Sequence, residues 1–310
     1  MKNKSVIWLI MILIAQTGCN VVPLSVRLPE MKFSNDAVIN DSTGLSWEQG
    51  RIAFFSSRPA NFNGSNHINT GFVFLMSDDG SQIAYIEGTF HSLESRIAWS
   101  SDGKMMAITA YDENIEAYCL TILNEDGKEC LVRNGYFPDW AQEGHKLSYY
   151  RLDGNNNRPG LYSYNLDTGE SKIIVELPNP RNTLSSWSPD GKSIVYEIYN
   201  QDIYQNEIWL YSLASSKKQF LGNGQMPSWS SKNEIAYIRD GELWVFNIDK
   251  STESQVVSEF NDISWPSWSP DGKQLLFTQS GNIYVYDMYV DILRQLTNDK
   301  FVDEAPSWRP

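Results

Sequence analysis

The chain has 310 residues, a formal charge of -13 and an aromatic content of 13%, with 11 tryptophans. A chain longer than about 250 to 300 residues exceeds what one ordinary hydrophobic core can fill, so two domains or a repeat architecture is expected. The aromatic content, with no segment of helical periodicity after residue 20, favours an all-β protein. The acidity argues against a nucleic-acid partner, because phosphate binding needs a basic surface.

The N-terminal residues have the pattern of an export signal. Lys2 and Lys4 precede the uncharged run 6–15, which is too short to cross a bilayer because a spanning helix needs about 20 apolar residues. We therefore predict a signal peptide over residues 1–18.

The end of this run resembles the bacterial lipoprotein signal, in which a cysteine after a small residue is lipidated. Here Gly18 precedes Cys19, although Gln16 stands where that signal usually has leucine. The resemblance implies that Cys19 carries the lipid, with ordinary cleavage nearby as the alternative. Residues 19–46 contain Pro23 and Pro29 and lack strand periodicity, so we predict a tether there.

A tryptophan followed by a turn recurs along the rest of the chain. Successive spacings of 52, 41, 47, 42, 39 and 40 residues separate the repeats. The repeat tryptophans are Trp47, Trp99, Trp140, Trp187, Trp229, Trp268 and Trp308. A four-stranded propeller blade needs about 40 to 45 residues, so the spacing predicts a six-bladed β-propeller of four-stranded antiparallel blades over residues 47–310.

The turn after each tryptophan has a physical basis. In Ser188-Pro189-Asp190-Gly191 the proline has the φ that a type I turn needs at its second position, and the glycine supplies the left-handed backbone at the fourth. Large aromatic side chains alternate along the third strands, as in Trp244 and Phe246, which predicts packing of one blade against the next.

The stretch from Pro266 to Thr297 resembles the repeat of TolB-type propellers. It contains Pro-x-Trp-Ser-Pro-Asp-Gly-Lys, then Ile-Tyr-Val-x-Asp and Arg-x-Leu-Thr. The repeats at Trp187 and Trp268 match fully, whereas the repeat at Trp229 lacks the Asp-Gly pair. The resemblance covers about residue 50 to the C-terminus and implies a rigid ring with a protein- or ligand-binding face. The extra α/β domain that TolB carries before its propeller has no counterpart in the short N-terminal segment.

The two ends of the repeat region complement each other. The first repeat has a shortened turn after Trp47, and residues 305–308 form an inner strand without the rest of its blade. We predict that residues 305–308 are the inner strand of the blade whose outer strands lie within residues 50–88, so that a C-terminal strand closes the ring.

Cys119 and Cys130 flank a predicted hairpin turn at residues 124–127 and lie on adjacent strands. Adjacent-strand geometry disfavours a disulfide, so two small buried side chains are the favoured interpretation and a bond the alternative.

Catalytic and metal-binding patterns are weak. The only histidines are His67, His91 and His145, and blade topology separates His145 from the other two. The loop at Asp153 begins like a calcium loop but has Arg158 where glycine is needed. No catalytic residue, metal or cofactor is therefore predicted.

The working surface is predicted on the face that holds the loops joining second to third strands and the loops leading into each Pro-x-Trp. The long loop from Ser56 to Gly71 belongs to this face. Its candidate partner-binding residues are His91, Tyr136, Arg181, Asp262, Trp265, Asp303 and Glu304. Trp265 is predicted in a loop, where it either contacts a partner or caps the central channel.

Three functional hypotheses follow. The first is a non-enzymatic, monomeric cell-envelope lipoprotein, attached to the membrane only by its lipid, whose propeller binds an unidentified envelope protein or cell-surface ligand. The second is a carbohydrate-active lyase or hydrolase that works at the central pocket, which would need acids or histidines converging there. The third is a sensory module with a closed ligand pocket.

Overall fold

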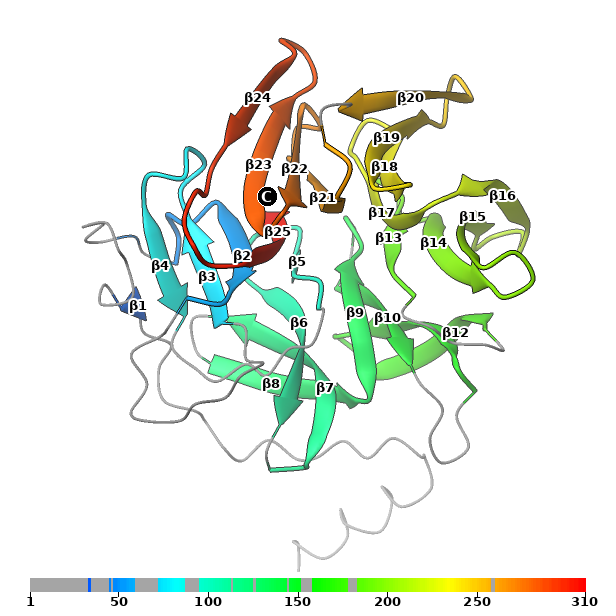
Figure 1. The fold of residues 1–310 in the computed structure, drawn as a ribbon. Helices are drawn as coiled ribbons and strands as arrows, with labels where there is room; N and C mark the ends of the chain where they lie inside the picture. Colours follow the sequence, from blue (N-terminus) through cyan, green and yellow to red (C-terminus); the bar gives the residue numbers. More distant parts are fainter. Residues whose placement is uncertain are drawn as a thin grey trace, which may run out of the picture.

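The computed structural model describes residues 45, 47–58, 72–86, 95–112, 114–124, 127–143, 145–151, 158–177, 183–257 and 260–310, and the backbone of 33–34. Within these residues the chain forms strands and turns without a helix. Six antiparallel sheets are arranged in a ring around a central channel (Figure 1). The predicted six-bladed propeller of four-stranded blades is confirmed.

Each blade runs from an inner strand at the channel to an outer strand at the rim. Blade 1 contains β25 (Asp303–Trp308), β2 (Ile52–Ser56), β3 (Phe72–Met76) and β4 (Ile83–Ile86), with β1 (Phe33–Ser34) paired outside β4. Blade 2 contains β5 (Ala98–Trp99), β6 (Met106–Asp112), β7 (Ala117–Asn124) and β8 (Gly127–Arg133). Blade 3 contains β9 (Gly135–Trp140), β10 (Lys146–Arg151), β11 (Gly160–Asn165) and β12 (Glu170–Glu176).

The remaining blades have the same order. Blade 4 contains β13 (Ser185–Trp187), β14 (Ser193–Asn200), β15 (Gln205–Ser212) and β16 (Lys218–Asn223). Blade 5 contains β17 (Gln225–Trp229), β18 (Glu234–Arg239), β19 (Glu242–Asn247) and β20 (Thr252–Val257). Blade 6 contains β21 (Ile263–Trp268), β22 (Gln274–Gln279), β23 (Asn282–Asp287) and β24 (Ile292–Gln295).

Hydrophobic packing is divided among the interfaces between neighbouring blades. Six clusters of buried side chains occur among the described residues, and each joins two adjacent blades. Between blades 1 and 6, for example, Phe54 and Phe74 pack against Leu276. Stability is therefore a sum over neighbouring blades, and each blade depends on having a neighbour on both sides.

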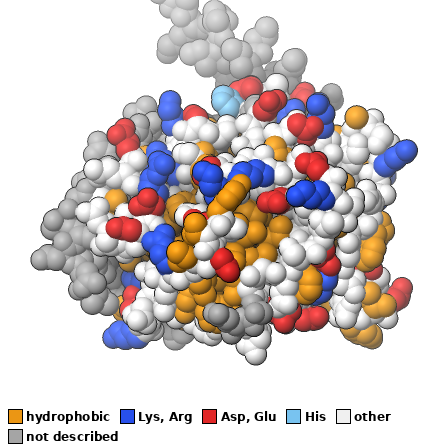
Figure 2. All heavy atoms as spheres, turned by 90° about the horizontal axis from the view of Figure 1, so that it is seen from above, with side chains coloured by type: hydrophobic (Ala, Val, Ile, Leu, Met, Phe, Trp, Pro, Cys, Tyr) orange, Lys and Arg blue, Asp and Glu red, His pale blue; other side chains and the backbone are white. Residues whose placement is uncertain are grey.

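The rim of the ring retains exposed apolar surface where outer strands diverge. Hydrophobic side chains gather in the hollow between β20 and β24, and lysine, arginine and acidic side chains surround them (Figure 2). Tyr284, Met288 and Leu293 are only partly buried against the cluster that joins blades 5 and 6. The interface between blades 5 and 6 therefore has fully buried side chains near the channel and partly exposed ones at its outer radius.

The turn that follows the repeat tryptophan is built as its sequence predicts. In blade 4 the amide of Gly191 donates to the carbonyl of Ser188, and Gly191 has φ of +63°. The Ser188 hydroxyl donates to Asp190, whose carboxylate also accepts the amide of Lys192. The same contacts recur after Trp99 and Trp268. Because the side chains satisfy the backbone of the turn internally, these turns are short and uniform.

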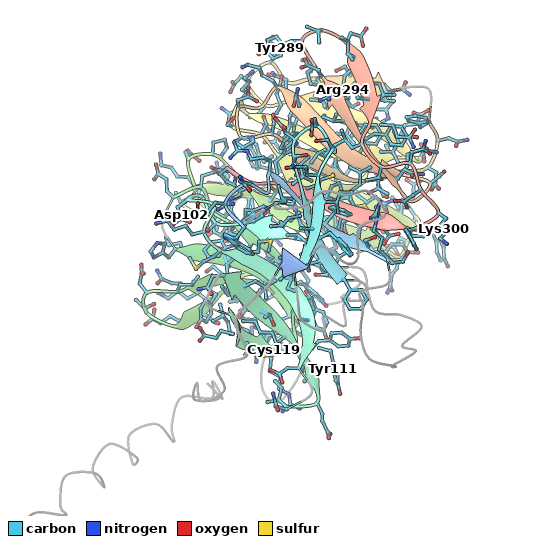
Figure 3. All side chains as sticks on the ribbon, turned by 90° about the vertical axis from the view of Figure 1, so that its left-hand side faces the viewer. Asp102, Tyr111, Cys119, Tyr289, Arg294 and Lys300 are labelled. Carbon is cyan, nitrogen blue, oxygen red and sulfur yellow. A yellow bond between two sulfur atoms is a disulfide. The ribbon has the colours of Figure 1, made fainter. Side chains whose placement is uncertain are left out.

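The ring has two distinct faces. We call the end that carries the turns after the tryptophans the turn face, and the end where second and third strands are joined the loop face. Seen from the side, Asp102 lies on the turn face, and Tyr111 and Lys300 lie on the loop face (Figure 3).

The predicted closure by a C-terminal strand is also confirmed. β25 pairs antiparallel with β2, with Ile52 opposite Trp308 and Ser56 opposite Asp303. Closure thus joins residues more than 240 positions apart in the chain without a covalent link.

Two arginines fix the closing strand at its two ends. On the loop face the Arg58 guanidinium binds the Asp303 carboxylate, and Arg58 and Asp303 are 3% and 0% exposed. At the other end Arg309 donates to the Trp47 carbonyl, and its guanidinium lies 5.1 Å from the centre of the Trp99 ring. Each guanidinium therefore has a partner at one end of the closing strand: a carboxylate for Arg58, and a carbonyl and an aromatic ring for Arg309.

The segment predicted as a tether contributes to the fold at its end. Leu45 is 3% exposed and packs in the same cluster as Trp47 and Trp99. The backbone of 33–34 adds the short strand β1 to blade 1. Packing against the propeller therefore begins before residue 47.

The favoured interpretation of Cys119 and Cys130 as unbonded is wrong, because the two form a disulfide (Figure 3). Cys130 lies opposite Thr121 and Cys119 lies opposite Arg133, and a bulge in β8 lies between these two pairs. Both cysteines are on one face of the sheet, and their Cα atoms are 5.6 Å apart, within the range that a disulfide spans. The bulge could not be predicted from the sequence, and it brings the diagonal pair together.

The buried pair at the closing strand gives a stability prediction. Arg58→Met should lower the free energy of unfolding by about 3–5 kcal/mol, because it leaves the Asp303 carboxylate buried without a counter-ion. The measurement is urea unfolding followed by tryptophan fluorescence.

Arg158→Met is the matched control. Arg158 also pairs with a carboxylate, that of Glu176, but its side chain is 74% exposed. The control should change the free energy of unfolding by less than about 1 kcal/mol. Equal effects of the two substitutions would show that the Arg58 pair does not secure the closing strand.

Candidate functional site

A ring of five small polar side chains and one alanine surrounds the central channel. They come from the position before each repeat tryptophan, which places them on the inner strands facing the channel. The six residues are Ala98, Asp139, Ser186, Ser228, Ser267 and Ser307. Inner strands expose one edge to the channel, so a side chain at this position can reach the neighbouring blade.

Several of these side chains tie one blade to the next. The Trp187 amide donates to Asp139 at 3.0 Å, and the Trp229 amide donates to the Ser186 hydroxyl at 3.1 Å. The Trp308 amide donates to Ser267 at 3.4 Å. The polar ring therefore satisfies inner-strand amides that no sheet partner reaches, which a buried amide requires.

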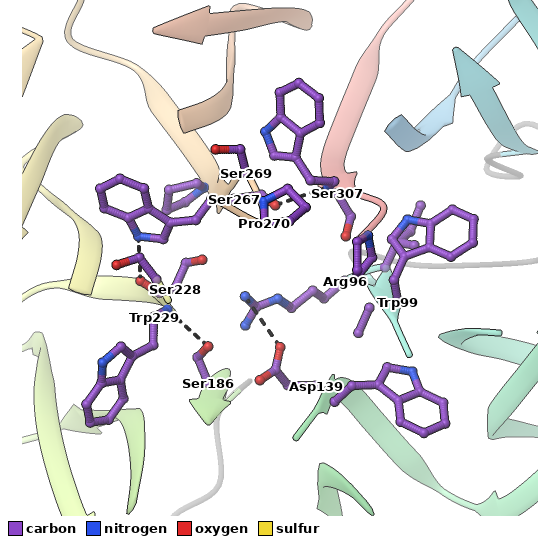
Figure 4. A pocket seen from close by; sticks show the side chains of 18 of the residues that line it. Arg96, Trp99, Asp139, Ser186, Ser228, Trp229, Ser267, Ser269, Pro270 and Ser307 are labelled. Carbon is purple, nitrogen blue, oxygen red and sulfur yellow. Dashed lines mark hydrogen bonds and ion pairs between the residues drawn. The ribbon is translucent and has the colours of Figure 1, made fainter. Parts of the chain in front are cut away.

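The Arg96 side chain extends across the channel (Figure 4). Its Nη1 donates to the Ser185 carbonyl at 2.7 Å and to the Pro227 carbonyl at 3.3 Å, and its Nη2 lies 3.6 Å from Asp139 Oδ1. Arg96 precedes β5 of blade 2, while its three partners belong to blades 4, 5 and 3. One side chain thus connects four of the six blades.

Two carboxylates near Arg96 are buried. Burial raises the pKa of Asp139, and the Arg96 charge and the Trp187 amide oppose this shift. Glu197, on β14, is 4% exposed and accepts the amides of Leu184 and Met226. Burial raises the pKa of Glu197 to about 7, although both amides and Arg96 act to lower it. Burial on β14, behind the inner strand, therefore brings the pKa of Glu197 close to neutral pH.

The side chain of Trp265 lies at the loop-face end of the channel. It is partly buried and packs against two clusters on different sides of the ring, one containing Ile97 and Ala305 and the other containing Phe137 and Leu184. Its position in β21 is a correction, because it was expected in a loop. Trp265 has φ of +55°, and the pairing with β22 shifts by one residue there.

The same bulge recurs before each Pro-x-Trp. Phe137, Met226 and Ala305 also have φ between +50° and +56°, each directly before a proline. A proline on an inner strand needs no hydrogen-bond partner, and the bulge before it redirects the preceding side chain. This turns the Trp265 indole across the end of the channel.

Below Arg96 and Trp265 the channel forms a blind well of about 120 Å³. Its walls include the six residues of this ring, and its rim includes Gln142, Ser231 and Pro270 from the turns after the tryptophans. The well therefore opens on the turn face, and Arg96 and Trp265 lie at its closed end.

The predicted partner-binding residues are scattered. Cys19, His91, Arg181 and residues 59–71 of the long loop lie outside the described residues. Asp262 and Glu304 are exposed on the loop face. Asp303 was predicted to contact a partner, but it is fully buried against Arg58 because it holds the closing strand.

The remaining candidate, Tyr136, is half-buried in a row of aromatic rings. Its centroid lies 6.1 Å from that of Tyr118, which lies 5.4 Å from that of Tyr111. Tyr111 and Tyr118 belong to the hairpin that joins the second and third strands of blade 2. Tyr136 is therefore part of an aromatic row on the loop face.

Sequence reasoning missed Arg96 and Glu197. Alignment of the repeats places Arg96 at the position filled by Phe137, Met226 and Trp265 in other blades, and a lone basic residue among apolar ones was a usable signal. Glu197 was visible as an acid within the apolar strand Ile194–Ile198.

Serines, tryptophans and prolines make up most of the residues that line the well. Its lining residues include neither histidine nor cysteine, and no group of three potential metal ligands occurs within the described ranges. His145 is exposed on the turn face and pairs with Asp167, which raises its pKa. The serine hydroxyls, Asp139 and Arg96 that line the well can hold polar groups by hydrogen bonds.

No family model matches the chain. Among curated proteins it is 20% identical over 192 residues to a probable dipeptidyl-aminopeptidase B of Sclerotinia sclerotiorum, covering 59% of this chain and 20% of that protein. It is 25% identical over 189 residues to the Tol-Pal system protein TolB of Francisella tularensis, covering 56% of this chain and 42% of that protein. The chain thus spans less than half the length of these relatives.

Solved structures show the same fold at low identity. TolB from Acinetobacter baumannii superposes with a TM-score of 0.69 and 17% identity over 84% of this chain and 67% of that one. A putative TolB from Agrobacterium tumefaciens gives 0.58 and 14%, over 80% and 88%. A chain of a nidogen/laminin complex gives 0.58 and 11%, over 84% and 99%. The chain therefore has the fold of a TolB-like propeller.

The buried carboxyl group of Glu197 gives a pH prediction. Between about pH 4.5 and 7 the folded protein retains a proton on Glu197 that the unfolded chain has released. The contribution of Glu197 to stability therefore falls as the pH rises through this window, by up to about 1.4 kcal/mol per pH unit, and is constant above it.

Glu197→Gln removes this titration. The difference in free energy of unfolding between wild type and variant, measured by urea unfolding from pH 4 to pH 9, should shift in favour of the variant as the pH rises towards 7. A difference that does not vary with pH would mean that Glu197 titrates alike in the folded and unfolded chain.

Proposed function

We propose that the protein is an exported, lipid-anchored scaffold of the cell envelope that binds another protein on its loop face and performs no chemistry. The observation that carries this proposal is the row of half-buried rings formed by Tyr111, Tyr118 and Tyr136. Partly exposed aromatic clusters on a rigid support are typical of protein interfaces, because each ring buries a large area at little cost in conformational entropy.

The surroundings of this row support a protein partner. Trp265 and Tyr136 pack against the same cluster, so the row extends to the closed end of the channel. Asp262 and Glu304 are exposed on the same face, and the chain as a whole carries -13. We therefore propose a partner that presents apolar side chains surrounded by basic ones.

The TolB-like fold agrees with a binding role. The name of one relative refers to the Tol-Pal system, and one structural neighbour is a chain of a nidogen/laminin complex. The peptidase relatives have chains about five times longer than the region matched. Their activity therefore gives no residue of this chain a catalytic role.

An enzyme of cell-surface carbohydrate is the second candidate. It is favoured by Arg96 and Asp139, which bring charge into the well. Against it, Asp139 already accepts the Trp187 amide, and the lining residues supply no imidazole. A carbohydrate hydrolase needs two carboxyl groups on opposite sides of its substrate, whereas Asp139 is the only acidic side chain among the residues that line the well.

Membrane attachment is proposed through the lipid on Cys19. No helix within the described ranges is long and apolar enough to cross a membrane. The charged start, short apolar run and Gly18-Cys19 pair are the support for the anchor.

Cys19→Ser tests the anchor. It should move the protein from the membrane fraction to the soluble fraction, or leave the uncleaved precursor, because the thiol that receives the lipid is absent. Fractionation with immunoblotting measures both outcomes. Unchanged membrane association of a processed Cys19→Ser protein would exclude lipidation at this residue.

Photo-crosslinking in the cells that make the protein tests the docking face. A photoreactive phenylalanine at Tyr118 should form an adduct with one protein, and the same residue at Gln142 on the turn face should not. With that protein purified, Tyr118→Ala should weaken binding by roughly tenfold or more, as loss of a central interface aromatic does.

Glu143→Lys on the turn face is the matched control for Glu304→Lys on the loop face, since both side chains are exposed acids. The control should leave binding unchanged, and Glu304→Lys should weaken it. Adducts and losses of affinity confined to the turn face would reverse the assignment.

A further inference from the structure

We propose that the blind well in the channel binds a single neutral, polyhydroxylated ring, that is, one sugar unit. This site opens on the turn face, opposite the face proposed for a protein partner, and it does not depend on that proposal.

Arg96 provides unused hydrogen-bond donors at the closed end of the well. A guanidinium has five N–H donors, and the two on Nη1 are used by the Ser185 and Pro227 carbonyls. The Nη2 to Asp139 separation of 3.6 Å is too long for a hydrogen bond. The Nε and Nη2 donors, on a side chain only 14% exposed, therefore have no acceptor among the described residues.

Two hydroxyl groups on the wall are also unpaired. Ser228 and Ser307 are 4% and 8% exposed, and no described residue forms a hydrogen bond with either hydroxyl. Neither hydroxyl oxygen is among the fully enclosed polar atoms, so both can be reached from the well. Both side chains line the well (Figure 4), so a bound molecule with hydroxyl groups would satisfy them together with Arg96.

The charges in the well select a neutral ligand. Arg96 disfavours a cation, and the Asp139 carboxylate beside it disfavours an anion. A guanidinium next to a carboxylate offers donors and acceptors side by side. Two neighbouring hydroxyl groups of a sugar match this arrangement, because each hydroxyl both donates and accepts.

The size of the well sets the length of the ligand. A cavity needs about 10–15 Å³ for each water-sized group, so a well of 120 Å³ holds roughly eight to twelve such groups. A hexose has about twelve non-hydrogen atoms, so one hexose is close to the capacity of the well. Because Arg96 and Trp265 close the far end, a longer chain cannot pass through. The ligand is therefore a free monosaccharide or the terminal unit of a glycan.

Calorimetry on the full protein tests the site with D-glucose, D-galactose and N-acetyl-D-glucosamine as probes, and with cyclohexanol and acetate as controls. At least one sugar should bind at a stoichiometry of one, and both controls should fail because they lack neighbouring hydroxyl groups or carry charge. A sugar that binds is then compared with a glycan that ends in it, which distinguishes the free from the terminal form.

Ser228→Ala and Ser307→Ala should each weaken that binding by about two- to tenfold, the effect of one neutral hydrogen bond. Neither should lower the thermal midpoint, because neither hydroxyl is bonded within the protein. Ser254→Ala, on the exposed strand β20, is the matched control and should leave binding unchanged.

Three results would overturn the proposal. The first is that none of the sugars gives heat up to about 100 mM, a concentration at which a site with a Kd of about 10 mM would be nearly saturated. The second is that acetate binds and no sugar does. The third is that a sugar binds equally well to wild type, Ser228→Ala and Ser307→Ala. The first result would mean that water alone fills the well.

Discussion

The pairing of β25 with β2 is the interaction on which the rest of the structure depends. Each blade is stable only with a neighbour on both sides, so an open ring would expose the clusters on both sides of blade 1. The closing strand is short, and pairing alone would leave it prone to fraying. Arg58 and Arg309 prevent this by placing a buried cation at each end, one on Asp303 and one on the Trp47 carbonyl.

Closure also determines what the channel can be. Because the ring is continuous, Arg96 can reach across it to three other blades, and the bulge at Trp265 can direct an indole over one end. The channel is consequently a well with one opening rather than a passage. The loop face carries the aromatic row of Tyr111, Tyr118 and Tyr136, and the turn face carries the opening of the well.

The sequence predicted the features that depend on local chemistry. Ser188 to Gly191 specifies its turn because the Ser188 and Asp190 side chains bond to each other and to nearby backbone amides, and the unpaired repeat at residues 305–308 indicated how the ring closes. It could not predict features that depend on register or on distant neighbours. The bulge that brings Cys119 to Cys130, the burial of Asp303 against Arg58 and the placement of Trp265 all arise when strands pair or blades meet. Arg58 and Asp303 are 245 residues apart in the chain, and the meeting of Cys119 with Cys130 depends on the register of two neighbouring strands.

The central claim is that the ring is closed by a strand as stable as the strands within a blade. Native-state hydrogen exchange measures this directly, because each amide reports the free energy of the opening that exposes it. We expect the amides of β25 that pair with β2 to exchange with the same free energy as those of β14 and β15 in blade 4, through global unfolding. Exchange of β25 with a much lower free energy, at the rate of a fraying terminus, would show that the ring opens at blade 1 and that the closing strand does not secure it.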